Sequence, residues 1–363
     1  MSNVNGSPKA DVQPPVVTKT ERPMINESGL FQFRLDAQKT PSTPPASARK
    51  RVMTCLDGSA LAECVLPLSS FMASALDAEL TLLHVIPAPE NSEPLAFDVL
   101  DWEISRRESE EYLTRKHAEL TAHGGLATEQ LRHELTQGRP AARLLAVEQE
   151  LTPSLTVLCR RGAGSSPHGG LGATAQQVVG GVRGSVLLVP AGMTPVVPPK
   201  RIMIALDGSF RAESVFPMAQ AIAARVADAE LILVHVVTEP CATGVLSDPE
   251  DMKMATLLAS HMEVSGASYL HALTERLSST LPRIKSCVVR HADIRAALLD
   301  TARSEKADMI ILSAHGSVCN AEHSFGSVAA HVLQYASIPV LAVQDLPGPP
   351  SSLRERRDGW TAQ

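Results

Sequence analysis

Short apolar runs alternate with longer stretches of mixed polarity along most of the chain. Most of these runs are aliphatic and bounded by turn-forming residues, which is typical of buried β-strands. The stretches between them have the length and polarity of helices. In the first half, the predicted strands are 50–56, 79–86, 128–135, 154–158 and 186–189, with helices over 60–76 and about 97–122, after Pro140, and before the last strand.

The second half of the chain repeats the first. Residues 51–73 and 201–223 are identical at 11 of 23 positions, and residues 77–86 and 228–237 at 7 of 10. Similarity of this kind identifies an internal duplication. The matching predictions are strands over 200–206, 230–237, 284–290, 308–312 and 340–343, with helices over 211–226 and about 249–281, after His291, and before the last strand.

This order of elements predicts an α/β fold of two tandem, doubly wound, Rossmann-like domains, each with a five-stranded parallel sheet. Strands that are apolar throughout belong to a parallel sheet covered on both faces. Crossovers are right-handed, and ligands bind outside the carboxyl ends of the strands where the winding reverses. The loops after the first and fourth strands of each half are therefore the candidate sites.

The repeat also sets the expected domain boundaries. We expect one domain over 49–191 and a second over 199–345, joined by a proline-containing linker over 192–198. The remaining segments are rich in proline and polar residues, which is typical of chain that does not fold alone. We therefore expect a disordered N-terminal arm over 1–48 and a flexible tail over 346–363.

Composition narrows the class of protein. The 363 residues suit two domains, and 44% of them are hydrophobic but 3% aromatic, so the cores must be aliphatic. The net charge of −6 argues against a general nucleic-acid binder. No apolar run reaches the length that crosses a bilayer, and no secretory signal is visible. Six cysteines without a CxxC motif are typical of reduced thiols in a cytoplasmic protein.

Each first strand ends in an Asp-Gly-Ser turn, with Asp57 in the first half and Asp207 in the second. An aspartate at a strand end can accept hydrogen bonds from a sugar hydroxyl or an adenine amino group. Asp or Ser in this position can equally cap the following helix. Taken alone, this loop favours the capping role.

The loop after the fourth strand of the second half has a pattern suited to an anion. Ser313 and Gly316 are followed, after nine residues, by Gly326, Ser327 and Val328, which open a helix. Glycines allow backbone N–H groups to approach phosphate oxygens, and a helix N-terminus adds partial positive charge. The loop contains no GxxxxGK sequence, and the first-half glycines do not form a dinucleotide fingerprint.

Together, the Leu-Asp-Gly-Ser strand ends, the Leu-x-His-Val second strands and this loop resemble the universal stress protein family in tandem form, over roughly residues 50–345. Its nucleotide-binding members carry G-x2-G-x9-G-[S/T], which Gly316, Gly326 and Ser327 match while Ser313 replaces the first glycine. The resemblance implies an adenine nucleotide alpha-hydrolase-like fold with phosphates on this loop. It also implies adenosine against Ala205, Asp207 and Val236.

In the first half the same frame gives Cys159, Gly162 and, nine residues later, Gly172 and Ala173, with Asp57 and Val85 as the other matching positions. Two interpretations stay open. Either Arg160 and Arg161 supply charge to phosphate, or this half has lost its ligand and acts as a structural partner. A lost hydrogen bond to a charged group costs about 1.5–3 kcal/mol, which weakens affinity roughly 10- to 100-fold. Loss or weak binding is favoured here.

The resemblance predicts a stress-response regulatory protein that binds ATP, ADP or AMP mainly in the second domain, without dedicated catalysis. The alternatives are a nucleotide-free interaction scaffold of the same fold and a slow ATPase. Because single-domain members commonly pair, the duplication suggests an intrachain pseudo-dimer formed through the two fifth strands. A further homodimer and the identity of protein partners stay open.

Several histidines, one cysteine and one glutamate near the candidate loops could be catalytic or metal-binding, but the sequence favours simpler roles for them. His315 and His323 flank Cys319 on one loop, but nothing in the sequence orients them as a base or a zinc site, so solvated or hydrogen-bonded histidines are favoured. Glu322, a single carboxylate, gives weak support for Mg²⁺. His84 and His235 follow apolar strand residues and are expected to be satisfied strand-end histidines, not ligands.

Overall fold

The computed structural model describes residues 50–87, 99–123, 126–162, 164, 170–238, 249–281, 283–316 and 324–344. The expected N-terminal arm (1–48) and tail (346–363) lie outside these ranges. Cys319, Glu322 and His323 lie outside them as well.

The first domain alternates strands and helices as predicted. Its strands are β1 (Arg51–Leu56), β2 (Glu79–Pro87), β3 (Leu131–Gly138), β4 (Leu155–Cys159) and β5 (Ser185–Val189). Its α-helices are α1 (Leu66–Leu76), α2 (Val99–His123), α3 (Pro140–Leu151) and α4 (Ala173–Gly181), with short 3-10 turns η1 (Ala62–Val65) and η2 (Thr128–Gln130).

The second domain has the same order of elements. Its strands are β6 (Arg201–Leu206), β7 (Glu230–Thr238), β8 (Ile284–His291), β9 (Met309–Ser313) and β10 (Val340–Val343). Its helices are α5 (Phe210–Glu213), α6 (Phe216–Ala223), α7 (Pro249–Leu277), α8 (Ile294–Ser304) and α9 (Ser327–Tyr335).

Each domain has a five-stranded parallel sheet, in the order β3-β2-β1-β4-β5 and β8-β7-β6-β9-β10. The winding reverses where β1 pairs with β4 and where β6 pairs with β9. The prediction of two tandem doubly wound domains is therefore confirmed. Both switch points lie at the carboxyl ends of the first and fourth strands, where the sequence placed its candidate loops.

Two apolar cores lie on opposite faces of the sheet and run through both domains. One contains buried residues of α1, α2, α6 and α7, and the other contains buried residues of α3, α4, α8 and α9. Neighbouring strand residues alternate between the two, so Leu82 belongs to the first core and Leu83 to the second. This coverage of both faces explains why the strands are apolar throughout.

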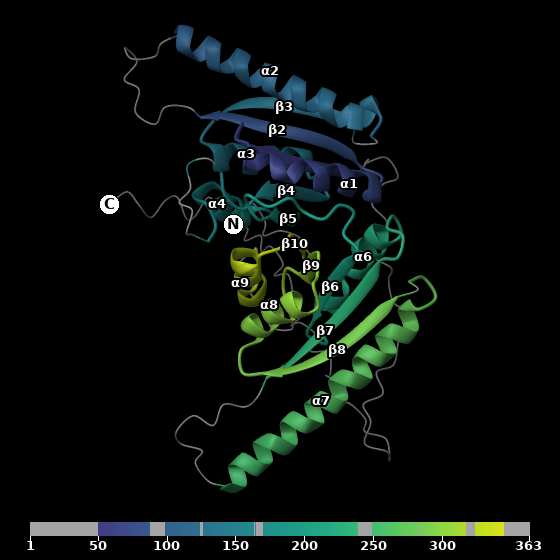
Figure 1. The fold of residues 1–363 in the computed structure, drawn as a ribbon. Helices are drawn as coiled ribbons and strands as arrows, with labels where there is room; N and C mark the ends of the chain where they lie inside the picture. Colours follow the sequence, from purple (N-terminus) through teal and green to yellow (C-terminus); the bar gives the residue numbers. More distant parts are fainter. Residues whose placement is uncertain are drawn as a thin grey trace, which may run out of the picture. The chain divides into compact units, whose positions relative to one another are not determined.

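The two sheets join edge to edge through an antiparallel pair between β5 and β10, which lie side by side in Figure 1. In this pair Leu187 faces Leu341, which occupies the same place in the second domain as Leu187 does in the first. The register is therefore that of a pseudo-two-fold axis, and the ten strands form one sheet. The expected pairing through the fifth strands is present.

Side chains near the fourth-strand loops also connect the domains. Ser324 donates from Oγ to the carbonyl of Gly180 at the end of α4, at 3.1 Å. On the other side, Arg160 donates from Nη1 to the carbonyls of Gln334, at 3.3 Å, and of Ala336. These carbonyls belong to the C-terminal end of α9, where a cation is favoured by the helix dipole.

The first helix of each domain differs from its prediction. We expected continuous helices over 60–76 and 211–226, and this was wrong, because each divides just before a proline. Pro67 and Pro217 lie in the first turn of α1 and α6. A proline lacks the N–H group and its ring clashes with the carbonyl four residues earlier, so it is tolerated at a helix start and not in the interior.

The third strand of the first domain also begins later than expected, at Leu131 instead of residue 128. Residues 128–130 form a 3-10 turn, in which the Gln130 side chain accepts a hydrogen bond from the Ala127 N–H at 3.2 Å. This local bond competes with strand pairing, which explains the difference.

Replacing Arg160 with alanine should lower the free energy of unfolding by about 1–3 kcal/mol, because the carbonyls at the end of α9 lose a charged donor. Chemical denaturation measures the change. Arg303→Ala is the control, since that side chain is 66% exposed and pairs with Asp300 within one helix, so its loss should stay within about 0.5 kcal/mol. Equal losses in the two variants would contradict the interdomain role of Arg160.

Candidate functional site

The turn after β6 is held by its own polar side chains. Ser209 caps α5 by accepting a hydrogen bond from the Ala212 N–H at 3.2 Å. Asp207 Oδ1 accepts from the Ser209 N–H at 3.0 Å and from the Ser209 hydroxyl at 2.6 Å. Gly208 has a φ of +82°, a conformation that favours glycine. The capping role thus falls to the serine, while the aspartate braces the turn.

The second oxygen of Asp207 faces the fourth-strand loop. A Cβ atom added at Gly316 would lie 2.6 Å from Asp207 Oδ2, closer than real Cβ atoms come to a neighbour. Glycine at position 316 therefore lets the two loops of the switch point meet. Gly326 is different, because a Cβ there would have its nearest contact at 3.5 Å, an ordinary distance.

The fourth-strand loop folds back onto the start of α9. The Gly326 N–H donates to the Ala314 carbonyl at 2.7 Å, and the Ala314 N–H donates to Val343 on β10 at 2.7 Å. Ser313, which stands where the family motif has a glycine, donates its hydroxyl proton to the His315 carbonyl at 2.7 Å. Its side chain is thus directed onto its own loop.

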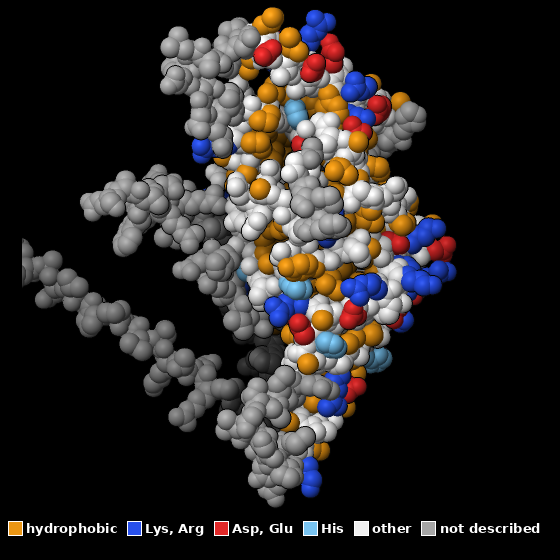
Figure 2. All heavy atoms as spheres, turned by 60° about the vertical axis from the view of Figure 1, so that its left-hand side comes forward, with side chains coloured by type: hydrophobic (Ala, Val, Ile, Leu, Met, Phe, Trp, Pro, Cys, Tyr) orange, Lys and Arg blue, Asp and Glu red, His pale blue; other side chains and the backbone are white. Residues whose placement is uncertain are grey.

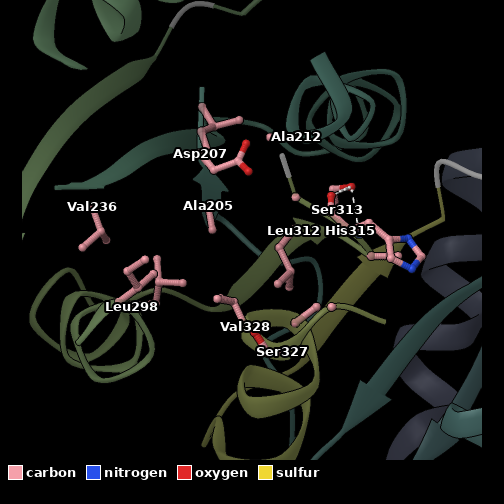
Figure 3. A pocket seen from close by; sticks show the side chains of 16 residues that line it. Ala205, Asp207, Ala212, Val236, Leu298, Leu312, Ser313, His315, Ser327 and Val328 are labelled. Carbon is pink, nitrogen blue, oxygen red and sulfur yellow. Dashed lines mark hydrogen bonds between the residues drawn. The ribbon is translucent and has the colours of Figure 1, made fainter. Parts of the chain in front are cut away.

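A cavity of about 270 Å³ lies between these loops and is shown in Figure 3. Every site residue that the sequence proposed for the second domain lines it, namely Ala205, Asp207, Val236, Ser313, Gly316, Gly326, Ser327 and Val328. The sequence missed Ile294 and Leu298, which α8 contributes to the wall. Their i,i+4 spacing in a helix beside the switch point was the signal available for them.

The wall of the cavity changes character from one side to the other. In Figure 3 Val236 and Leu298 lie on one side and Ser313 lies on the other, with Leu312 and Ser327 between them. No Lys or Arg is among the described residues that line it. On the face shown in Figure 2, acidic and basic side chains are interspersed. Attraction for an anion at this cavity would therefore come from backbone N–H groups and the α9 N-terminus.

The histidines near the switch points have separate roles. His315 is 3% exposed, so the solvated alternative is wrong for it, and Figure 3 shows its ring pointing away from Val236 and Leu298. His84 and His235 place Nδ1 2.9 Å from the carbonyls of Leu56 and Leu206 respectively. The prediction that these two are satisfied strand-end histidines is confirmed.

The first domain keeps a cavity at the equivalent place, with a volume of about 320 Å³. Asp57, Val85, Gly162 and Gly172 line it, together with Cys159 and Ala173. The close approach of the two loops is also kept, since a Cβ at Gly162 would lie 2.2 Å from Asp57 Oδ2. Arg160, however, donates to carbonyls at the end of α9 in the second domain, while a role of Arg161 toward phosphate stays a prediction.

Comparison with known proteins now decides the family. The model of the universal stress protein family matches twice, over residues 48–190 and 198–344. The chain belongs to the universal stress protein family. It is a tandem, two-domain member, and membership supports a role in the stress response.

Solved structures agree with this universal stress protein at the level of the fold. A universal stress protein from Archaeoglobus fulgidus is 16% identical, with a TM-score of 0.57, and the match covers 81% of this chain and 96% of that one. A putative universal stress protein from Pseudomonas aeruginosa is 13% identical, with a TM-score of 0.53, covering 82% and 94%. A search of curated proteins finds no match.

Two further findings concern the described part of this universal stress protein. None of its helices there is both long enough and apolar enough to cross a membrane. Within the same residues, no group of three or more His, Cys, Asp or Glu side chains is placed to hold a metal ion.

Replacing Gly316 with alanine should destabilise this universal stress protein by about 1 kcal/mol, because the Asp207 carboxylate must move and weaken its hydrogen bonds with Ser209. In an Asp207→Ala background the same substitution should cost much less, since the obstructing oxygen is gone. Thermal and chemical unfolding of the four proteins give the coupling. An equal cost in both backgrounds would show that Asp207 is not what requires the glycine.

Proposed function

We propose that this universal stress protein is a regulatory protein that binds an adenine nucleotide, ATP, ADP or AMP, in the cavity of its second domain. The observation that carries the proposal is the composition of that single cavity. It joins an apolar wall and a strand-end carboxylate to a glycine-containing loop at a helix N-terminus. An apolar ring, a sugar and a phosphate group need these three surroundings in this order.

The apolar side suits the base and the sugar. Val236, Leu298 and Leu312 offer aliphatic surface to the faces of an adenine ring, and Ala205 leaves space beside them. Asp207 lies at the edge of this wall, where a carboxylate can accept hydrogen bonds from ribose hydroxyls. A wall of this kind with a few polar groups is typical of small-molecule sites.

The loop side suits the phosphates. Helix α9 begins at Ser327, and the first backbone hydrogen bond into it runs from the Ala330 N–H to Gly326, at 2.9 Å. The N–H groups that precede it in the first turn have no acceptor within the helix. Such groups, the helix dipole and the Ser327 hydroxyl favour a bound anion. Mg²⁺ is a candidate companion of the nucleotide, and titration with and without EDTA tests it.

The second domain is favoured over the first because of two positions. Ser327 at the start of α9 corresponds to Ala173 at the start of α4, which has no hydroxyl to donate. Ser313 corresponds to Cys159, and its hydroxyl holds the loop by donating to the His315 carbonyl, a bond that a thiol makes less well. We therefore expect one strong nucleotide site per chain. We expect no dedicated catalysis, because the ring of His315 is buried and turned away from the apolar wall.

Replacing Gly326 with aspartate should reduce ATP affinity at least tenfold, because it places a carboxylate where the phosphates are expected. The fold should tolerate the change, since a Cβ fits at this position and aspartate is a favourable N-cap residue. Isothermal titration calorimetry gives the affinity and the stoichiometry.

Two matched variants separate charge from shape and one domain from the other. Gly326→Asn adds a side chain of nearly the same shape without charge and should weaken binding less. Gly172→Asp makes the same change at the start of α4, where a Cβ also has its nearest contact at 3.5 Å, and should leave ATP binding intact. A loss caused by Gly172→Asp and not by Gly326→Asp would move the site to the first domain. Absence of heat with the unmodified protein would favour the scaffold alternative.

A further inference from the structure

Two cysteines distant in sequence meet at the cavity of the first domain. The sulfur of Cys64, on the 3-10 turn η1, lies 3.7 Å from the sulfur of Cys159, the last residue of β4. Both are free thiols. They therefore lie in van der Waals contact across the switch point, on the two segments that border the cavity.

A small reagent can approach the pair from the cavity. Cys159 is only 8% exposed, but it lines the cavity of about 320 Å³, and Cys64 is partly exposed. Cys55 lines the same cavity but is a different kind of thiol, because burial raises its pKa to about 12. It has no sulfur partner among the described residues. The cavity wall thus contains one sulfur of the close pair, Cys159, and one separate thiol, Cys55, that burial keeps protonated.

The surroundings of the pair favour one thiolate. The pKa of Cys159 is lowered to about 7, chiefly by the hydrogen bond that the Cys64 thiol donates to it and also by the Arg161 backbone N–H. The pKa of Cys64 is raised by the same interaction and by burial. A thiolate is the nucleophilic form of cysteine, so the two sulfurs have unequal roles.

The second domain lacks both thiols. In the duplication Cys64 corresponds to Ser214 and Cys159 to Ser313, so each sulfur has a hydroxyl as its counterpart. The same backbone arrangement in the second domain therefore accommodates serine at both positions. The thiol pair is therefore a feature that the cavity of the second domain does not have. The two serine counterparts also indicate suitable control substitutions for the cysteines.

We propose that Cys64 and Cys159 form a peroxide-oxidisable dithiol site in the first domain, with Cys159 as the sulfur that is attacked first and Cys64 as the resolving thiol. The site is independent of nucleotide binding in the second domain. The oxidant is a hydroperoxide such as hydrogen peroxide.

The chemistry balances in two steps. The Cys159 thiolate attacks one peroxide oxygen, so an S–O bond forms, the O–O bond breaks, and hydroxide leaves with Cys159 as a sulfenic acid. The Cys64 sulfur then attacks the Cys159 sulfur, so an S–S bond forms and the S–O bond breaks. The displaced hydroxide takes the Cys64 proton and leaves as water. Two thiols and one peroxide give one disulfide and two waters.

The second step needs a small movement. The sulfurs must approach from 3.7 Å to about 2.05 Å, the length of a disulfide bond. Cys64 lies on a short 3-10 turn just before α1, and the hydrogen bonds of such a turn have poorer geometry than those of an α-helix. The resulting bond would tie η1 to the end of β4, whose Cys159 lines the cavity.

Peptide mapping of the full chain tests the site. After treatment with hydrogen peroxide and alkylation of the remaining thiols, cleavage after Glu63 separates Cys55 from Cys64. We expect a linked peptide that contains Cys64 and Cys159, is lighter by two hydrogens than its two parts, and separates on reduction. Cys55→Ser should leave this product unchanged. A linked peptide that joins either sulfur to another cysteine, or none at all, would overturn the proposal.

Single serine variants test the order of the two steps. With Cys64→Ser, we expect a sulfenic acid to accumulate on Cys159 and react with dimedone. With Cys159→Ser, Cys64 should stay unoxidised under the same conditions. The reverse pattern would overturn the assignment. Because Ser214 and Ser313 stand at the equivalent positions, both variants should fold, and circular dichroism checks this.

The rate of oxidation should follow the ionisation of Cys159. With a pKa of about 7, the thiolate fraction of Cys159 rises about tenfold from pH 6 to pH 8. In Cys64→Ser, which lacks the donor thiol, the pH dependence of dimedone labelling shows whether the pKa of Cys159 stays low. In the unmodified protein, disulfide formation should rise about tenfold over this interval and then level off. A rate that keeps rising through pH 9, as for an ordinary thiol, would contradict the role given to the pair.

Discussion

The parallel pairing of β1 with β4, and of β6 with β9, is the constraint on which both cavities depend. The chain that leaves the first strand packs on one face of the sheet, and the chain that leaves the fourth packs on the other. The two loops therefore diverge and leave space at the carboxyl edge. Backbone N–H groups at the start of α4 and α9 and the strand-end aspartates reach that space because of this arrangement.

The two domains share the backbone arrangement at the cavity and differ there in only a few side chains. Both keep the braced aspartate and the glycine that approaches it, which hold the loops together. What differs is a few side chains at the cavity, where hydroxyls in one copy correspond to a thiol and a methyl group in the other. The backbone thus provides the shape of the site, while its chemistry depends on residues that the fold does not require.

Local signals in the sequence explain which features could be predicted. The strands are continuous apolar runs, the repeat shares six of nine residues over 51–59 and 201–209, and the candidate loops follow from topology. Pro67 and Pro217 mark where the first helices divide, which apolar periodicity alone does not show. The direction of Arg160 could not be predicted, because its acceptors are carbonyls of another domain. The contact between Cys64 and Cys159 likewise depends on tertiary packing across 95 positions.

The pseudo-two-fold join has a consequence for how such a pair can evolve. Two identical chains that assemble must carry every substitution twice, and their assembly depends on protein concentration. Here one polypeptide holds both copies, so the join forms at any dilution and each copy can change alone. Arg160 holds α9 from one side, whereas its counterpart is Ala314, which has no side chain to do the same. Covalent linkage thus gives the asymmetry of a heterodimer with a fixed one-to-one ratio and no need for partner recognition.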